Sequence, residues 1–206
     1  MTAAEPHHRF DWGVAARPLA GEQESGDLHV VCPFEGGALV AVIDALGHGA
    51  PAAAVARRAA ATLEARAGQP IDRIVRHCHD ALQGTRGVVL SIASIQIDDS
   101  TMEFLGVGNI ETLLVAADAG GAGRATLLTR RGVVGGGLPV LRPLTVPLAA
   151  GDTLCFATDG VDPRFTSDRP QRLPPQQMAE TILARYGKSS DDALVLVVRI
   201  LELPRR

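Results

Sequence analysis

The stretch LVAVIDALGHGAPAAAVARRAA, residues 39–60, changes its pattern twice within a few residues. Its first five residues are apolar, as in a buried strand, and this run stops at Asp44. A Gly-His-Gly turn follows, and the alanine-rich segment after it favours a helix. The stretch therefore predicts a rigid strand that carries a carboxylate to the surface, followed by a tight turn into a helix.

The size of the chain favours a single domain covering residues 1–206. With 206 residues, of which 46% are hydrophobic, the chain can bury a substantial core without disulfides or structural metals. Its three cysteines, Cys32, Cys78 and Cys155, are odd in number and form no CxxC pair. We expect them to be reduced and mostly buried thiols.

Charge and hydropathy argue against two classes of partner. The net charge is −3 and the pI is about 6.1, so the chain lacks the basic field that holds nucleic acid. No segment approaches the roughly 20 apolar residues that a membrane-spanning helix needs, and residues 1–20 do not resemble a leader peptide. We expect a cytoplasmic protein that binds neither nucleic acid nor membranes.

Apolar runs separated by turn residues outline an α+β fold. Strands are expected over 10–18, 27–33, 37–44, 87–98, 101–108, 111–118, 125–130, 152–159 and 193–203, and helices over 52–68, 70–84 and 174–187. Asp98, Asp99 and Ser100 form a hairpin signal, which makes sequential strands antiparallel. The class is therefore antiparallel sheets with helices on their faces, because a repeating βαβ pattern is missing.

Four aspartates lie at the ends of these predicted strands. Asp44 and Asp159 each close an apolar run, whereas Asp27 and Asp191 each open one. In an antiparallel sheet the end of one strand lies beside the start of its neighbour, so all four can meet on one rim. Like charges that gather raise one another's pKa, and hard cations such as Mg²⁺ or Mn²⁺ remove that penalty. Two such ions form the clamp used to transfer a phosphoryl group to water.

Each aspartate taken singly has a simpler explanation, because Asp beside Gly or Ser is common turn and cap chemistry. The metal-site hypothesis depends on four aspartates with matching placement. In that hypothesis Gly47 and Gly49 let the backbone turn tightly next to the site.

Five blocks, taken in order, resemble the signature motifs of the PPM-type metal-dependent serine/threonine phosphatases. They are ESGD (24–27), VIDALGHGAPAA (42–53), GVGNIE (106–111), ATDG (157–160) and SDDALVLVV (190–198). Within that superfamily they resemble the SpoIIE-like branch, and most closely the small RsbX-type phosphatases. The resemblance implies an αββα sandwich, a centre of two Mn²⁺ or Mg²⁺ ions, and hydrolysis of phosphoserine or phosphothreonine on a STAS-domain regulator of a stress-signalling assembly.

The resemblance also implies roles for single residues. Asp44 matches the aspartate that bridges both metals, and the backbone carbonyl of Ala45, where the family usually has glycine, matches the ligand beside it. Asp27 matches the SGD carboxylate, Asp159 the DG carboxylate, and Asp191 the first aspartate of the closing pair.

His48 has two possible roles. In the larger relatives a histidine two residues after the bridging aspartate is the proposed general acid, whereas His48 follows Asp44 by four residues. A histidine that holds the loop by hydrogen bonding is the interpretation we favour over catalysis.

Three other features bear on function. The glycine-rich stretches 120–123 and 132–137 lack the rest of a phosphate-binding loop and are expected to be a hairpin turn and a mobile surface loop. Loops 120–140 and 161–175 are expected to dock the protein substrate. A degenerate phosphatase that binds phosphoproteins or acts as a scaffold remains the alternative to an enzyme.

Overall fold

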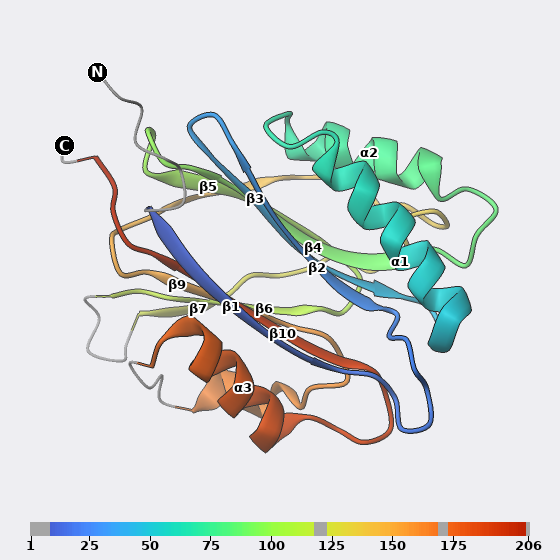
Figure 1. Cartoon of the computed structure of the whole chain (residues 1–206). Coiled ribbons are helices and arrows are strands. Elements are labelled where there is room, and N and C mark those ends of the chain that lie inside the picture. The colour runs from blue at the N-terminus through green and yellow to red at the C-terminus, as the bar shows by residue number, and fades with distance from the viewer. Residues whose placement is uncertain (1–8, 118–122, 169–172, 205–206) are drawn as a thin grey trace.

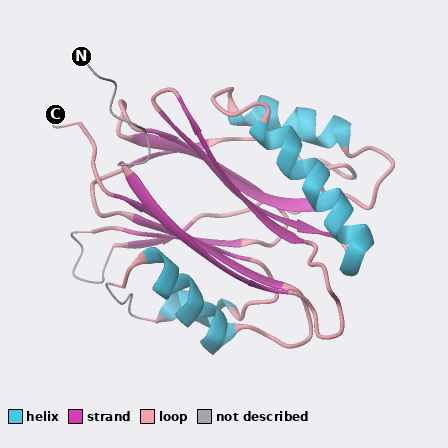
Figure 2. Ribbon diagram, viewed as in Figure 1, coloured by secondary structure: helices cyan, strands magenta, loops and turns pink. Residues whose placement is uncertain are grey.

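Two antiparallel sheets, packed face to face, form the centre of the molecule in the computed structural model (Figure 1, Figure 2). The structure describes residues 9–117, 123–168 and 173–204. The first sheet has the strand order β1 (Phe10–Arg17), β10 (Ala193–Ile200), β9 (Thr153–Ala157), β6 (Glu111–Val115) and β7 (Arg124–Thr126). The second has the order β2 (Asp27–Phe34), β3 (Gly37–Ala45), β4 (Val88–Gln96), β5 (Thr101–Val107) and β8 (Leu144–Pro147).

Helices cover the outer face of each sheet (Figure 1). Helices α1 (Gly49–Glu64) and α2 (Ile71–Ala81) lie over the second sheet, and α3 (Pro175–Tyr186) lies over the first. A short 3₁₀ helix, η2 (Pro163–Ser167), precedes α3. The predicted αββα sandwich is therefore confirmed.

Strand β3 is central because both of its faces are buried. Ala38, Val40 and Val42 point into the core between the sheets, whereas Leu39, Ala41 and Ile43 point toward α1 and α2. Alternate side chains of a strand leave opposite faces, so a continuous apolar run is what a strand between two packed layers requires. Its carboxyl end is thereby held in a fixed position.

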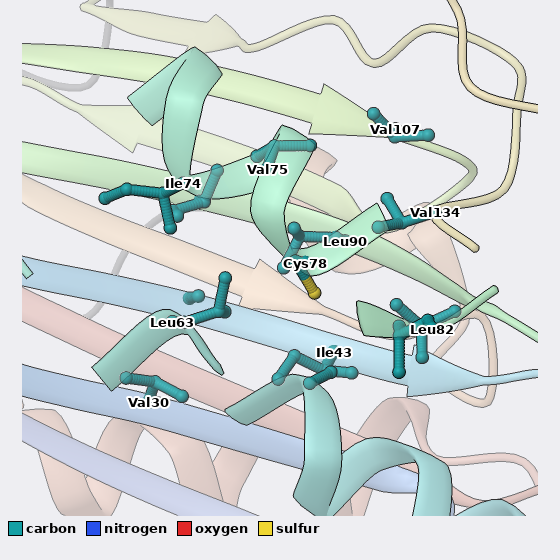
Figure 3. Packing of buried hydrophobic residues seen from close by; sticks show 14 of the residues in the cluster. Val30, Ile43, Leu63, Ile74, Val75, Cys78, Leu82, Leu90, Val107 and Val134 are labelled. Carbon is teal, nitrogen blue, oxygen red and sulfur yellow. The ribbon is translucent and has the colours of Figure 1, made fainter. Parts of the chain in front are cut away.

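The layer beneath α1 and α2 is a cluster of buried apolar side chains. Figure 3 shows Cys78 and Leu82, at the end of α2, beside Leu90 of β4 and Val134 of a later loop. Helix α1 presents mainly alanines to the sheet, and such small side chains allow close approach. Each large side chain that is fully buried here contributes about 1.5–3 kcal/mol relative to exposure.

Most predicted elements are present, with shifted ends. Helix α1 begins at Gly49 and ends at Glu64, so the expected segment 52–68 was placed three to four residues late. The glycine at its predicted end, Gly68, has φ of 87° and lies in the following turn. Strand β7 covers Arg124–Thr126, so it is shorter than the expected strand 125–130 and begins one residue earlier. Strand β8 and the 3₁₀ helix η2 were not anticipated.

The expectation of a mobile surface loop at 132–137 is wrong. Val134 is fully buried, and its backbone exchanges hydrogen bonds of 2.9 and 2.8 Å with Val88. The amide of Gly135 donates to His79 Nδ1 at 3.0 Å. A predominantly glycine and valine composition hid this anchoring, because the burial depends on helix α2 and strand β4. The other glycine-rich stretch, 120–123, lies largely outside the described residues.

Candidate active site

Asp27 and Asp44 oppose each other across the hairpin of β2 and β3. The register pairs them directly, with Asp27 as the first residue of β2 and Asp44 as the penultimate residue of β3. Directly opposed residues in an antiparallel pair have Cβ atoms about 4.5–5.5 Å apart. Two like charges are therefore held together by the backbone register itself.

The other two aspartates come from the first sheet. Asp159 follows β9 and Asp191 precedes β10, and these strands are antiparallel neighbours with Ala157 opposite Val195. The end of one strand therefore lies beside the start of the other, as the sequence predicted. Both carboxylates are exposed.

A cleft of about 350 Å³ lies at this junction of the two sheets. Asp44, Asp159 and Asp191 line it together, whereas the buried Asp27 does not. Its other lining residues come from the turn after β3 and from neighbouring loops: Leu19, Leu46, Gly47, His48, Val89, Asn109 and Ser190.

The two paired carboxyl groups resist ionisation. Burial, and after it the neighbouring Asp44 carboxylate, raises the pKa of Asp27 from 3.8 to about 8, although a hydrogen bond from Thr158 opposes the shift. Burial and then the carboxylates of Asp159 and Asp191 raise the pKa of Asp44 to about 7. The folded protein therefore holds two carboxyl groups where ionisation is costly in the absence of a cation.

Hydrogen bonds fix two of the aspartates. Thr158 Oγ1 donates to Asp27 Oδ2 at 2.7 Å and accepts the backbone N–H of Leu194 at 2.9 Å. Asn109 Nδ2 donates to Asp159 Oδ2 at 2.9 Å, and Lys188 Nζ donates to the backbone oxygen of Asp159 at 2.6 Å. Asn109 thus contacts one of the candidate metal ligands directly.

Asp191 and Asp192 have different environments. Asp192 is buried, and its two carboxylate oxygens accept the backbone N–H groups of Leu19 and Gly26, both at 2.7 Å. Asp191 is exposed and lines the cleft. Its Oδ1 accepts the N–H of Asp192 at 2.9 Å, which leaves Oδ2 directed to no described donor.

The turn after Asp44 needs both of its glycines. Gly47 and Gly49 have φ of 92° and 69°, values that side chains with a Cβ rarely adopt. A Cβ on Gly47 would lie 2.1 Å from Arg86 Nη1, and one on Gly49 would lie 2.6 Å from Glu22 Oε2. The two glycines thus admit two charged side chains to the edge of the cleft.

The same turn holds His48 and Ala45. His48 Nδ1 lies 2.6 Å from Glu22 Oε1, and the His48 side chain is 57% exposed. Ala45 is buried and extended, and its N–H donates to the Gly26 oxygen at 3.1 Å. Its φ is not positive, so alanine stands there without backbone strain where the related family has glycine.

The donor set fits a magnesium or manganese ion. All the candidate groups are oxygens, and within the described residues no donor is hydrogen-bonded to the Asp44 carboxylate. Among those residues no three His, Cys, Asp or Glu side chains converge closely enough to enclose an ion by themselves. Mg²⁺ typically binds through one or two carboxylates and retains several waters, so an open, acidic cleft suits it better than a closed cage.

Sequence reasoning missed Thr158, Lys188 and Glu22. None of them is an aspartate at the end of a predicted strand, which was the pattern that identified the other site residues. Each contacts a partner between 26 and 131 positions away in the sequence. Lys188 carried one available signal, because it is the only lysine in the chain. Gly160 was also missed. A Cβ there would lie 1.8 Å from the Asp192 backbone oxygen, a close approach that only the structure shows.

Comparison with known proteins places this fold and site in one family. Residues 35–201 match the family described as Stage II sporulation protein E (SpoIIE). No curated protein matches the chain. Because the match covers most of the sequence, the chain belongs to the SpoIIE family.

Solved structures agree with this assignment. A chain from work on the bacterial stressosome, described as a modular system adapted to control secondary messenger signalling, is 29% identical with a TM-score of 0.85. That match covers 93% of this chain and 100% of the other. RsbX in complex with magnesium is 21% identical with a TM-score of 0.83, over 97% of this chain and 100% of RsbX.

The PP2C phosphatase domain of SpoIIE from Bacillus subtilis is 22% identical, with a TM-score of 0.79, over 95% of this chain and 64% of the other. The chain is thus a PPM-type phosphatase of the SpoIIE-like branch, with the fold of the PP2C domains. No helix in the described ranges is long and apolar enough to cross a membrane.

Proposed function

We propose that this phosphatase dephosphorylates a STAS-domain regulator, or a similar regulatory protein, in a cytoplasmic stress-signalling assembly. Support for this substrate class comes from the stressosome chain and from the similarity to RsbX. The observation that carries the catalytic proposal is the set of aspartates that both sheets direct to one cleft.

In this proposal Asp27, Asp44, Asp159, Asp191 and the Ala45 carbonyl would hold two Mg²⁺ or Mn²⁺ ions. Bound divalent cations supply the positive charge that lowers the pKa of water and neutralises the phosphoryl oxygens. Hydrolysis transfers the phosphoryl group to water and returns a proton to the serine or threonine oxygen. No serine or cysteine of the chain needs to form a phosphoenzyme.

The surrounding residues prepare this site. Register holds Asp44 opposite Asp27, while the Thr158 hydroxyl fixes the Asp27 carboxylate. Asn109 and Lys188 fix the side chain and the peptide of Asp159. Such hydrogen bonds behind a metal ligand typically account for 10- to 100-fold in metal affinity or activity.

We assign His48 a positioning role. Its contact with Glu22 joins the turn after β3 to the segment before β2, so loss of the imidazole should loosen the turn. The alternative of a general acid requires an unobstructed path to the leaving oxygen, and the two roles differ in their response to the leaving group.

The decisive experiment compares turnover of p-nitrophenyl phosphate by the wild type, Asp44→Asn and Asp98→Asn. Asp98 is a matched control, because its side chain is 78% exposed and lies in the β4–β5 turn. We expect Mg²⁺- or Mn²⁺-dependent turnover that EDTA and Asp44→Asn abolish and that Asp98→Asn leaves intact.

A wild type that is folded, binds Mg²⁺ by calorimetry and hydrolyses no phosphomonoester would instead support the phosphoprotein-binding alternative. Metal-dependent activity retained by Asp44→Asn would show that the ligand assignment is wrong.

A further inference from the structure

Exposed apolar side chains cluster in one groove of this protein. Six large apolar side chains are exposed in the described part of the chain, and three of them line this groove. They are Leu128, Val140 and Leu144, which are 83%, 68% and 49% exposed. Single exposed apolar residues are ordinary, but a cluster beside a groove is typical of an interaction site.

The groove is also positively charged. Arg130 and Arg142 line it, and no carboxylate does. Within the described residues neither guanidinium has a carboxylate oxygen within 4.0 Å. The groove therefore pairs apolar contact area with two cations that have no counter-ion among the described residues, which suits an apolar segment that carries carboxylates.

The groove is preformed: strands β5 and β8 supply part of its wall, and backbone hydrogen bonds hold the loop that supplies the rest. Arg130 donates its N–H to Gly106 at 2.9 Å and accepts the N–H of Gly108 at 2.8 Å. Val134 pairs with Val88, and Leu141 is buried in the core beneath α2. A surface that is already ordered loses little conformational entropy when a partner binds, so its contacts yield more net affinity.

The groove adjoins the catalytic cleft. Gly108, which is bonded to the Arg130 backbone, precedes Asn109, and Asn109 lines the cleft and donates to Asp159. An extended segment in the groove would therefore reach the cleft within a few residues, at about 3.3 Å per residue.

A second copy of this chain fits the groove poorly. A symmetric dimer through this surface would bring Arg130 and Arg142 of one copy close to the same arginines of the other. Like charges at a desolvated interface oppose association. Charge complementarity instead favours an acidic partner.

We propose that this groove docks an acidic, apolar segment of the phosphoprotein substrate and thereby presents its phosphoserine to the cleft. Apolar side chains of the segment contact Leu128, Val140 and Leu144, and its carboxylates pair with Arg130 and Arg142. The proposal rests on the proposed phosphatase function, and it places the docking surface at residues 128–144, which overlap the expected docking loop 120–140 and extend past its end. The other expected docking loop, 161–175, includes residues 169–172, which lie outside the described part.

The test uses three synthetic 21-residue peptides with a central phosphoserine. The flanks on both sides contain Leu and Glu in the first peptide, Ser and Glu in the second, and Leu and Lys in the third. Ten flanking residues extend about 33 Å, enough to reach the groove from the cleft in either direction. We expect the wild type to dephosphorylate the Leu/Glu peptide with a kcat/KM about 10-fold above the other two.

Two double variants separate the apolar and charged contributions. Leu128→Ser with Val140→Ser should remove the preference for the Leu/Glu peptide over the Ser/Glu peptide. Arg130→Glu with Arg142→Glu should make the Leu/Lys peptide the better substrate. Turnover of p-nitrophenyl phosphate should remain unchanged in both, and Leu201→Ser, a residue 44% exposed outside the groove, should behave as wild type throughout.

Equal kcat/KM values for all three peptides in a wild type that hydrolyses p-nitrophenyl phosphate would overturn the docking proposal. The proposal would also be overturned if sedimentation showed that the wild type is a dimer and that, of these variants, only Leu128→Ser with Val140→Ser dissociates it, because the groove would then be a dimer interface. If the wild type hydrolyses nothing, the proposed function fails separately. Fluorescence anisotropy with the three labelled peptides then decides: tighter binding of the Leu/Glu peptide, lost in both double variants, supports docking, and equal binding refutes it.

Discussion

Neutralising Asp44 should stabilise the metal-free protein at neutral pH. The pKa values of Asp27 and Asp44 are raised in the folded state from 3.8 to about 8 and about 7. Between pH 4 and pH 7 the folded protein therefore holds protons that the unfolded chain releases. Stability from these groups is fully present below about pH 4 and is lost as pH rises through the folded pKa values.

The structure gives a magnitude for this effect. A carboxyl group whose pKa rises from 3.8 to about 7 on folding changes the free energy of unfolding by up to about 1.4 kcal/mol per pH unit, or about 2 kcal/mol between pH 5 and pH 7. Asp44→Asn removes one such group, and it also removes a charge that raises the pKa of Asp27. The variant should therefore gain on the wild type by at least that amount over the same range.

Urea unfolding in EDTA at pH 5, 6, 7 and 8 measures the difference in the free energy of unfolding between Asp44→Asn and the wild type. Mg²⁺ at 1,000 times its Kd should reverse the order, because it stabilises the folded state by about 4.1 kcal/mol and Asp44→Asn should bind it weakly. A difference between variant and wild type that is independent of pH in EDTA would refute the reasoning. So would a variant less stable than the wild type at pH 8.

Three further outcomes test the surroundings of the site. His48→Ala should lower turnover by less than the roughly 10²-fold expected for loss of a general acid, equally for p-nitrophenyl phosphate and phosphoserine; a loss confined to phosphoserine would contradict this. Gly160→Ala should lower the melting temperature by several degrees, since its Cβ would meet backbone at 1.8 Å, whereas Gly137→Ala, with open space around it, should not. Thr158→Val should lower the free energy of unfolding in urea at pH 8 by about 3 kcal/mol, because it removes the donor to Asp27 and leaves the buried N–H of Leu194 without an acceptor. Thr158→Ser, which keeps the hydroxyl, should cost under about 1 kcal/mol, and equal costs for the two variants would contradict this assignment.

Local sequence patterns were sufficient to predict the position of a residue where that position depends on one strand or on its neighbouring strand. The apolar run before Asp44 predicted a strand buried on both faces, and the antiparallel rule predicted that Asp27 would lie near it. In the structure the register pairs Asp27 directly with Asp44, a detail that the rule did not specify. Strands with both faces buried leave a strong signal, because every position must be apolar.

Long-range features left no such signal. Strand β8 is an edge strand that ends at Pro147 and whose residues are mostly exposed, so it shows neither apolar alternation nor a continuous run. The burial of Val134 depends on its pairing with Val88, and the hydrogen bond from Thr158 to Asp27 joins residues 131 positions apart. These contacts join segments far apart in the chain and form only in the folded state, so no window of sequence contains them.

Two hydrogen bonds described above cross from one layer of the sandwich to the other. Thr158, after β9, bonds to Asp27 of β2, and Asp192, before β10, accepts the N–H of Gly26. Apolar contact between the layers is non-directional, whereas hydrogen bonds fix both distance and angle. These two polar contacts therefore fix how the layers are aligned at this end. A substitution that removes either contact can move the Asp27 and Asp44 carboxylates relative to Asp159 and Asp191, even though all four aspartates are still present.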